Sequence, residues 1–144
     1  MRAAFKPVAV GLLSAFLLNL IWENAQAPFY AGYAGFGAHL GSCLRATGGD
    51  VLIVAAMYWM FAVTTSRWDW YRNADRQTYL VLAAVGVVAA MILEWWALAT
   101  ERWSYAGMPI LPVVGVGLLP VLQLALIPPA VVFLVGSFER EFDK

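Results

Sequence analysis

The sequence has few charged residues and few side chains that bind metals or form covalent links. Charged residues make up 12% of its 144 residues, and it contains one cysteine, Cys43, and one histidine, His39. A single cysteine excludes an intramolecular disulfide and a multi-cysteine metal or redox centre. The sequence also lacks a phosphate-binding glycine loop, a Ser/His/Asp nucleophile pattern and a basic face of the kind that binds nucleic acid. We expect no nucleic-acid partner, and the sequence identifies no cofactor.

Hydrophobic residues, in contrast, make up 62% of the chain. A spanning helix requires about 20 largely apolar residues, so the chain has room for four or five spans. No repeat or linker divides residues 1–144, which indicates a single domain. The sequence therefore predicts an all-α membrane protein, a bundle of four transmembrane helices over residues 7–27, 50–65, 78–100 and 111–136.

Glycine and proline shape the expected ends and contacts of these spans. The glycine-rich segment 29–49 predicts a loop, with room for some interfacial helix, and Gly48-Gly49-Asp50 is typical of a helix start, where the helix dipole favours a carboxylate. Gly86 predicts close packing of the third span against a neighbour. The fourth span contains Pro120, Pro128 and Pro129, which predict kinks.

Lysine and arginine in the connections predict the orientation, since short cytoplasmic loops carry an excess of both. With the N-terminus inside, four spans place two basic residues, Arg45 and Arg102, on the outer side. The cytoplasmic side then holds seven: Arg2, Lys6, Arg67, Arg72, Arg76, Arg140 and Lys144. Both termini are therefore predicted to face the cytoplasm.

Acidic residues occur only in the outer parts of the predicted spans and not in their inner halves. A charged carboxylate at mid-membrane costs roughly 2.5 to 3.5 kcal/mol, so Glu23 and Glu94 require an explanation. Glu23 shares one helix face with Asn19 and Gln26, because the three are spaced by four and three residues. We expect an outward-facing acidic cluster formed by Glu23, Asp50, Glu94 and Glu101.

Side chains of the outer connections are available to complete this cluster as binding residues: His39, Arg102, Trp103 and Tyr105. An alternative is that the polar groups only hold the helices together, with Glu23 or Glu94 protonated or paired with Arg45 or Arg102. Polar pairs in membranes contribute only about 0.6 kcal/mol on average, which favours a functional role. The aromatic residues around the acids are typical of an interfacial belt, and a substrate cage is the alternative.

A metal site at His39 and Cys43 has weaker support. These residues are four apart and would share a face if their segment were helical, with Glu23 or Asp50 as an oxygen ligand. Two candidate ligands are too few to predict a metal. The competing interpretation is a histidine that hydrogen-bonds a carboxylate and a cysteine that packs as a small apolar side chain.

Several short motifs are spread over most of the chain: Trp22-Glu23-x-x-Gln26, Gly49-Asp50 and Glu101-Arg102-Trp103-x-Tyr105. This pattern is similar to that of small bacterial membrane proteins, and the resemblance implies no activity. We expect the protein in a bacterial inner membrane. Membrane-bound carotenoid and terpene cyclases also use intramembrane acids on apolar substrates, but the chain shares no motif with them.

Two functions are consistent with the sequence. The first is a non-enzymatic component of the lipid bilayer that binds a lipid-like or other small ligand, or acts as an accessory to a membrane protein partner, through its outer acidic face. The second is a membrane enzyme that performs acid/base chemistry on an apolar lipid or isoprenoid, with Glu23 and Glu94 as acid and base and with Asp50 or His39 tuning them.

Overall fold

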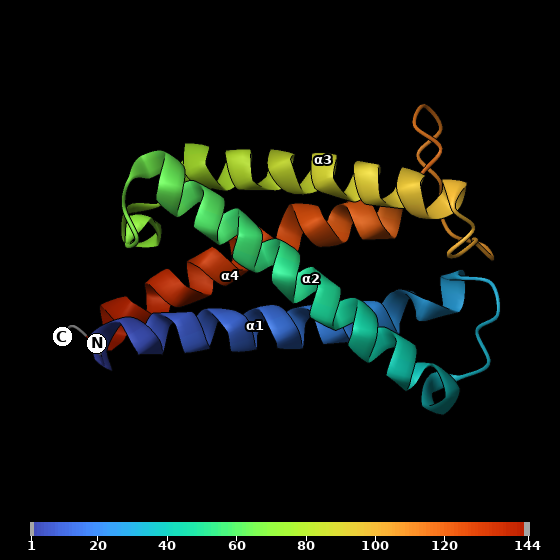
Figure 1. Ribbon diagram of the computed structural model, residues 1–144, viewed down its shortest axis with the longest axis horizontal. Helices are drawn as coiled ribbons and strands as arrows, with labels where there is room; N and C mark the ends of the chain where they lie inside the picture. The colour runs from blue at the N-terminus through green and yellow to red at the C-terminus, as the bar shows by residue number, and fades with distance from the viewer. Residues whose placement is uncertain (1, 143–144) are drawn as a thin grey trace.

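The computed structural model describes residues 2–142, and over these residues the regular structure is helical (Figure 1). Four long helices are joined by connections that include two short 3-10 turns, Ala27–Phe29 (η1) and Trp70–Asn73 (η2). All four are long and apolar enough to cross a membrane, which confirms the predicted number of spans. The helices are α1 (Arg2–Gln26), α2 (Phe36–Thr65), α3 (Arg76–Ala99) and α4 (Leu118–Phe142).

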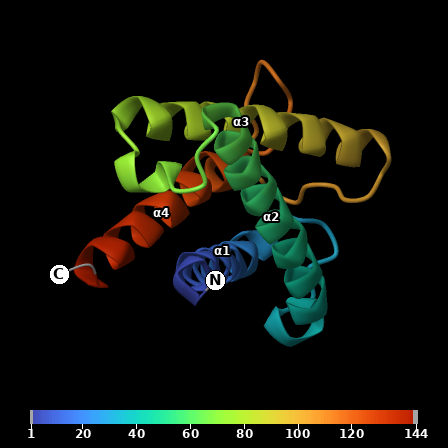
Figure 2. The same ribbon diagram turned by 60° about the vertical axis from the view of Figure 1, so that its left-hand side comes forward.

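The helices pack in the order α2, α1, α4, α3. The extensive contacts are those of α1 with α2, of α1 with α4 and of α4 with α3, whereas α2 and α3 contact each other little. Figures 1 and 2 show α2 crossing the bundle at an angle, so that it diverges from α3 along its length. The α1 start, the α4 end and connection 66–75 lie at one end of the bundle, here called the terminal end. Connections 27–35 and 100–117 lie at the other, the loop end.

The prediction for the second span is wrong at its start. We expected a loop over 29–49 and a helix from Asp50, but α2 begins at Phe36 and is the longest helix of the four, so Asp50 lies in its interior. The glycines of 37–49 do not make close contacts, since an added Cβ at any of them would meet nothing within 4 Å. Segment 36–65 contains no proline, and a backbone that enters a membrane has to satisfy its own hydrogen bonds, which favours a helix despite the glycines.

The fourth span also begins later than predicted, at Leu118 rather than at residue 111. Residues 110–117 form a tight hairpin instead, in which Leu111 N–H donates to Val116 O at 2.9 Å and Gly115 adopts a left-handed φ of 72°. Pro120 then falls in the first turn of α4, where its missing N–H costs nothing. Pro128 and Pro129 lie inside α4, and Figure 1 shows this helix changing direction along its length, as expected for prolines that interrupt the hydrogen-bond ladder.

The closest helix contact is between α3 and α4. A Cβ built on Gly86 would lie only 1.8 Å from the carbonyl oxygen of Leu124, so the backbones touch at a point that accepts only glycine. Small residues at helix interfaces allow this approach in membranes. The predicted role of Gly86 in close packing is therefore confirmed, and this contact fixes the register of α3 against α4.

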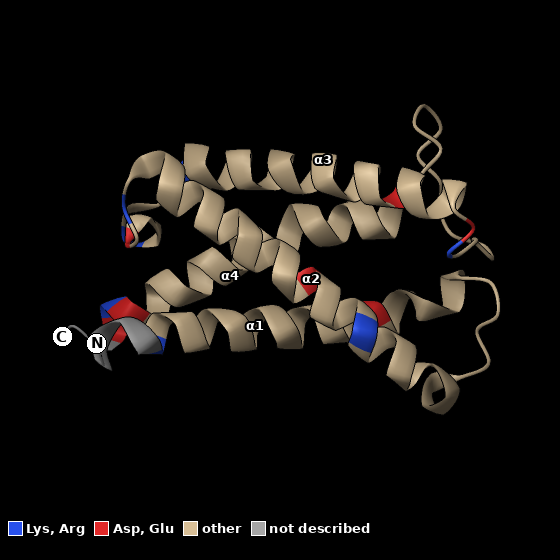
Figure 3. Ribbon diagram, in the orientation of Figure 1, with Lys and Arg blue, Asp and Glu red and all other residues tan. Residues whose placement is uncertain are grey.

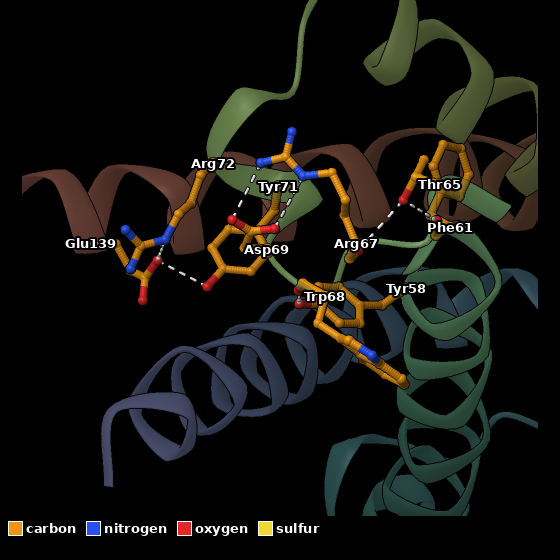
Figure 4. Close-up of polar contacts among 9 residues, drawn as sticks. All are labelled: Tyr58, Phe61, Thr65, Arg67, Trp68, Asp69, Tyr71, Arg72 and Glu139. Atoms are coloured by element: carbon orange, nitrogen blue, oxygen red, sulfur yellow. Dashed lines mark hydrogen bonds and ion pairs between the residues drawn. The ribbon is translucent and has the colours of Figure 1, made fainter. Parts of the chain in front are cut away.

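Connection 66–75 is tied to the end of α4 by polar contacts at the terminal end (Figure 4). Tyr71 donates its hydroxyl hydrogen to Glu139 at 2.8 Å, and Arg72 forms an ion pair with the same carboxylate at 2.6 Å. Trp70 and Tyr71 of this connection are buried. Residues Asp143 and Lys144, which enter the predicted charge distribution, lie outside the described residues.

Candidate functional site

A large open cavity lies in the half of the bundle nearer the loop end. Because α2 and α3 diverge, all four helices contribute to a space of about 1080 Å³ between them. Glu23 of α1, Asp50 of α2 and Glu94 of α3 line it, together with apolar residues such as Ile53, Leu93 and Leu124. Figure 3 shows acidic segments within these three helices in the same half of the molecule. The structure thus brings the three candidate catalytic carboxyl groups to one cavity.

Gln123 of α4 is the centre of a buried amide network at the base of this cavity. Its Nε2 donates to Asn19 Oδ1 at 2.9 Å and to Asp50 Oδ2 at 2.8 Å, and its Oε1 accepts from Gln26 Nε2 at 3.0 Å. Asn19, Gln26 and Gln123 are all at most 4% exposed. One α4 side chain therefore links α1 to α2 through hydrogen bonds, and the predicted polar face of α1 is turned into the bundle.

Glu23 and Asp50 are neighbours within this network, and their carboxyl groups lie close enough to interact with each other. Gln26 Nε2 also donates to Glu23 Oε1 at 2.7 Å. Among residues 2–142, no arginine or lysine forms an ion pair with Glu23, Asp50 or Glu94. Two neighbouring carboxyl groups without a cation are more stable when one of them keeps its proton, because two negative charges at short distance repel each other. Such a pair can both donate and accept a hydrogen bond.

Glu94 is held separately, on the α3 side of the cavity. It is 3% exposed, and its Oε2 accepts a hydrogen bond from the Tyr105 hydroxyl. Gly117 N–H donates to the same hydroxyl at 2.8 Å, so α3 and the end of connection 100–117 hold this hydroxyl from two sides. Burial raises the pKa of Tyr105, and its bond to Glu94 raises that pKa further, so the phenol keeps its proton and acts as the donor to the carboxyl group.

Connections 27–35 and 100–117 pair with each other over the loop end of the cavity. Ala31 N–H donates to Ser104 O at 2.9 Å, and Ala106 N–H donates to Phe29 O at 2.8 Å. Tyr30 packs edge-on against Trp103, with ring centroids 6.2 Å apart. Tyr30 and Trp103 thus line the cavity and Tyr105 packs against Tyr30, whereas Trp95 and Trp96 are about half exposed on α3, as expected of an interfacial belt.

Two buried polar atoms of cavity-lining side chains have no partner within the described residues. One is Oε1 of Gln26, a residue that is 4% exposed, and the other is the indole N–H of Trp103. The Trp103 ring lies beside Glu94 without a well-formed hydrogen bond to it. A buried polar atom without a partner is costly, so an acceptor and a donor at the cavity wall remain available to a ligand.

The remaining predicted residues line the cavity nearer to the loop end. His39 of α2 packs its ring against Tyr33, with centroids 5.0 Å apart, and Cys43 is buried with its thiol 3.8 Å from the carbonyl oxygen of Glu23. The described residues contain no group of three or more His, Cys, Asp or Glu side chains that could hold a metal ion. The site as described is therefore built from carboxyl, amide and aromatic groups.

Arg102 and Glu101 follow the end of α3. Glu101, which we expected in the acidic cluster, is not part of α3, because α3 ends at Ala99 and Glu101 adopts a left-handed φ of 55°. The Arg102 guanidinium lies 4.7 Å from the centroid of the Trp96 ring. Both residues still reach the wall of the cavity.

Gln123, Tyr30 and Arg45 line the cavity but were not among the predicted site residues, although Arg45 was considered as a cation that pairs with the acids. Gln123 is the one strongly polar side chain between Leu118 and Gly136, and an isolated amide in an apolar span was the available signal. Tyr30 and Arg45 carried no such signal, because their positions depend on the fold of segment 27–49.

No protein-family model, curated protein or solved structure matches this chain. The chemical capacity of the site therefore has to be derived from its geometry. Glu23 of α1 and Asp50 of α2 form a neighbouring pair of carboxyl groups, and Glu94 of α3 is bound to Tyr105. All three carboxyl groups face the same partly apolar cavity. Such a site can hydrogen-bond the polar group of an otherwise apolar ligand, or exchange protons with it.

Proposed function

We propose that the protein is a membrane component that binds a lipid-like ligand in the cavity between α2 and α3. The observation that carries this proposal is a cavity of about 1080 Å³ into which Glu23, Asp50 and Glu94 project without a cationic partner among the described residues. If the carboxyl groups served only to hold helices together, ion pairing with Arg45 or Arg102 and a filled interior would be expected. The geometry favours a binding site instead.

The lining indicates the chemistry of the ligand. Ile53, Leu93 and Leu124 offer an apolar surface, while Gln26 Oε1 offers an acceptor and the Glu23–Asp50 pair offers both a donor and an acceptor. A hydroxyl group matches such a mixed set, because it donates one hydrogen bond and accepts two. The proposed ligand therefore has a hydrocarbon part and at least one hydroxyl or comparable polar group.

The orientation and location belong to the same proposal. The α1 start, the α4 end and connection 66–75 lie at the terminal end, where most of the described lysine and arginine residues are found. The excess of basic residues in cytoplasmic loops supports a cytoplasmic terminal end. The carboxyl-lined cavity then opens in the outer leaflet, and the resemblance to small bacterial membrane proteins supports a bacterial inner membrane.

The test is to purify the full chain in a mild detergent, extract the bound lipids and identify them by mass spectrometry. The wild type is expected to retain a defined lipid, and Glu23→Gln and Asp50→Asn are expected to lose most of it. Glu141→Gln is the matched control, because this carboxyl group is exposed at the far end of α4. Thermal unfolding of each variant shows whether it is folded. A wild type that neither retains nor takes up any lipid would make the proposal wrong.

A second candidate is an enzyme that moves a proton on the same ligand. It is favoured by the arrangement of the two carboxyl sites, which approach the cavity from opposite sides, Glu23 with Asp50 on one and Glu94 with Tyr105 on the other. Protonation of an alkene carbon by Glu23 and removal of a proton from a neighbouring carbon by Glu94 would isomerise or cyclise an isoprenoid without a co-reactant. Conversion of the identified lipid that persists in Glu23→Gln and Glu94→Gln would exclude this candidate.

A further inference from the structure

The wall of the cavity also carries basic side chains. Arg45 and His39 of α2 and Arg102 of connection 100–117 all line it. Both arginines are exposed, and neither forms an ion pair with a carboxylate among residues 2–142. The Arg45 side chain is held only by a long 3.4 Å hydrogen bond to Gly41 O, and Arg102 rests on the Trp96 ring. These two guanidinium groups are available to an anion.

Arg45 and Arg102, here called the cationic rim, are separated from Asp50 and Glu94 by the spacing along α2 and α3. Asp50 follows Arg45 by five residues in α2, which corresponds to roughly 7.5 Å along the helix axis. Glu94 lies five residues before the last residue of α3, a similar depth below the connection that carries Arg102. Asp50 and Glu94 therefore lie further from the loop end than Arg45 and Arg102, whereas Arg45 lies close to the level of Glu23, because Cys43, two residues earlier in α2, contacts the Glu23 carbonyl oxygen.

We infer that the rim formed by Arg45 and Arg102 binds the phosphate of an anionic lipid, whose hydroxyl or glycerol region reaches the Glu23–Asp50 pair. This inference rests on the proposed lipid-binding function and specifies its ligand class. Arginine binds phosphate oxygens through paired, charge-assisted hydrogen bonds. An anion beside Asp50 or Glu94 would meet a carboxyl group without a cation, whereas at the rim the two arginines outnumber the exposed Glu101, so the phosphate is favoured at the rim.

The route of the hydrocarbon chain follows from the helix packing. Since α2 and α3 contact each other little and diverge toward the loop end, the side of the cavity between them is not closed by helix packing (Figure 1). The lid formed by connections 27–35 and 100–117 covers the loop end itself through its backbone hydrogen bonds. The hydrocarbon chain of the lipid therefore leaves the cavity sideways between α2 and α3. The lipid enters from the membrane rather than from water.

The experiment compares two lipids that differ only in the phosphate. Lysophosphatidic acid and the monoacylglycerol with the same acyl chain are added to the delipidated full chain in a mild detergent, and binding is measured by native mass spectrometry. The wild type is expected to bind the phosphate-bearing lipid at least about tenfold more tightly. Arg45→Gln and Arg102→Gln are each expected to weaken its binding by about tenfold and to leave monoacylglycerol binding unchanged.

Two controls test whether the preference for the phosphate-bearing lipid comes from the cavity arginines, from any surface cation or from a site for free phosphate. Arg76→Gln removes an exposed cation at the terminal end, outside the cavity, and is expected to bind both lipids as the wild type does. Inorganic phosphate at the concentration of the lipid is expected not to displace it, and displacement would show a free-phosphate site and overturn the inference. Equal binding of both lipids by the wild type, or unchanged binding in both arginine variants, would overturn it while leaving the proposed function in place. Binding of neither lipid would overturn the inference, and it would overturn the proposed function as well if the purified wild type also retains no lipid.

Discussion

Replacing Gly86 by alanine tests the contact that sets α3 against α4. The added Cβ would lie 1.8 Å from the Leu124 carbonyl oxygen and 2.6 Å from its carbonyl carbon, so this separation has to grow to about 3.4 Å before the atoms make ordinary contact. The obstacle is backbone and cannot rotate away. Overpacking of a well-packed contact costs about 1 to 3 kcal/mol or more, and alanine recovers at most about 1 kcal/mol through its helix propensity. We expect a net loss of about 2 kcal/mol in the free energy of unfolding.

The matched control is Gly41→Ala, which makes the same chemical change inside α2 where a Cβ would meet nothing within 4 Å. It is expected to leave stability unchanged or to raise it by up to about 1 kcal/mol. Unfolding in mixed micelles of a mild detergent and sodium dodecyl sulfate, followed by tryptophan fluorescence, measures both variants. Gly86→Ala as stable as Gly41→Ala would refute the close α3–α4 contact, and with it the placement of Glu94 at the cavity.

Two further predictions concern polar contacts at opposite ends of the molecule. Gln123→Leu removes the hydrogen bonds to Asn19, Asp50 and Gln26. It is expected to lower the free energy of unfolding by about 1 to 2 kcal/mol, near the upper limit measured for polar contacts in membranes. An unchanged unfolding curve in detergent would contradict the network. Asp75 caps α3 by accepting hydrogen bonds from the Thr78 hydroxyl and N–H, and these contacts hold its pKa below the ordinary value. The cap therefore stabilises the protein fully at pH values above the ordinary pKa of aspartate, and this stabilisation is lost as the pH falls through the lowered pKa of Asp75. Asp75→Ala should reduce the unfolding temperature at pH 7 and reduce it by less in acid. A difference in unfolding temperature that stays constant across pH would argue against the cap.

The sequence determined the features that depend on local spacing and on the length of apolar runs. A span needs a sufficient number of consecutive apolar residues, and this number predicted four helices that the structure has. Helical periodicity placed Asn19, Glu23 and Gln26 on one face, and that face lines the buried network. The positions of Glu23 and Glu94 within their spans predicted that both lie in the same half of the bundle, where one cavity contains them.

Local sequence patterns did not predict the starts of α2 and α4, because the glycine and proline content of a segment favoured one structure and its environment in the fold favoured another. The glycines of 37–49 indicated a loop, yet the segment is helical because its backbone hydrogen bonds are satisfied most readily within a helix. The start of α4 moved from residue 111 to Leu118, because Pro112 and Gly115 belong to a hairpin whose bonds connect residues on either side of it. Helix ends of this kind depend on contacts that a single segment does not contain.

Only the tertiary structure decided which carboxyl groups meet. The sequence paired Glu23 with Glu94 as acid and base, but the structure places Glu23 against Asp50 and gives Glu94 to Tyr105. These pairings depend on the rotation and register of whole helices, which the Gly86–Leu124 contact fixes for α3 and α4. A sequence specifies how far along its helix each polar group lies, whereas its partner is chosen by packing between segments that are distant in the chain.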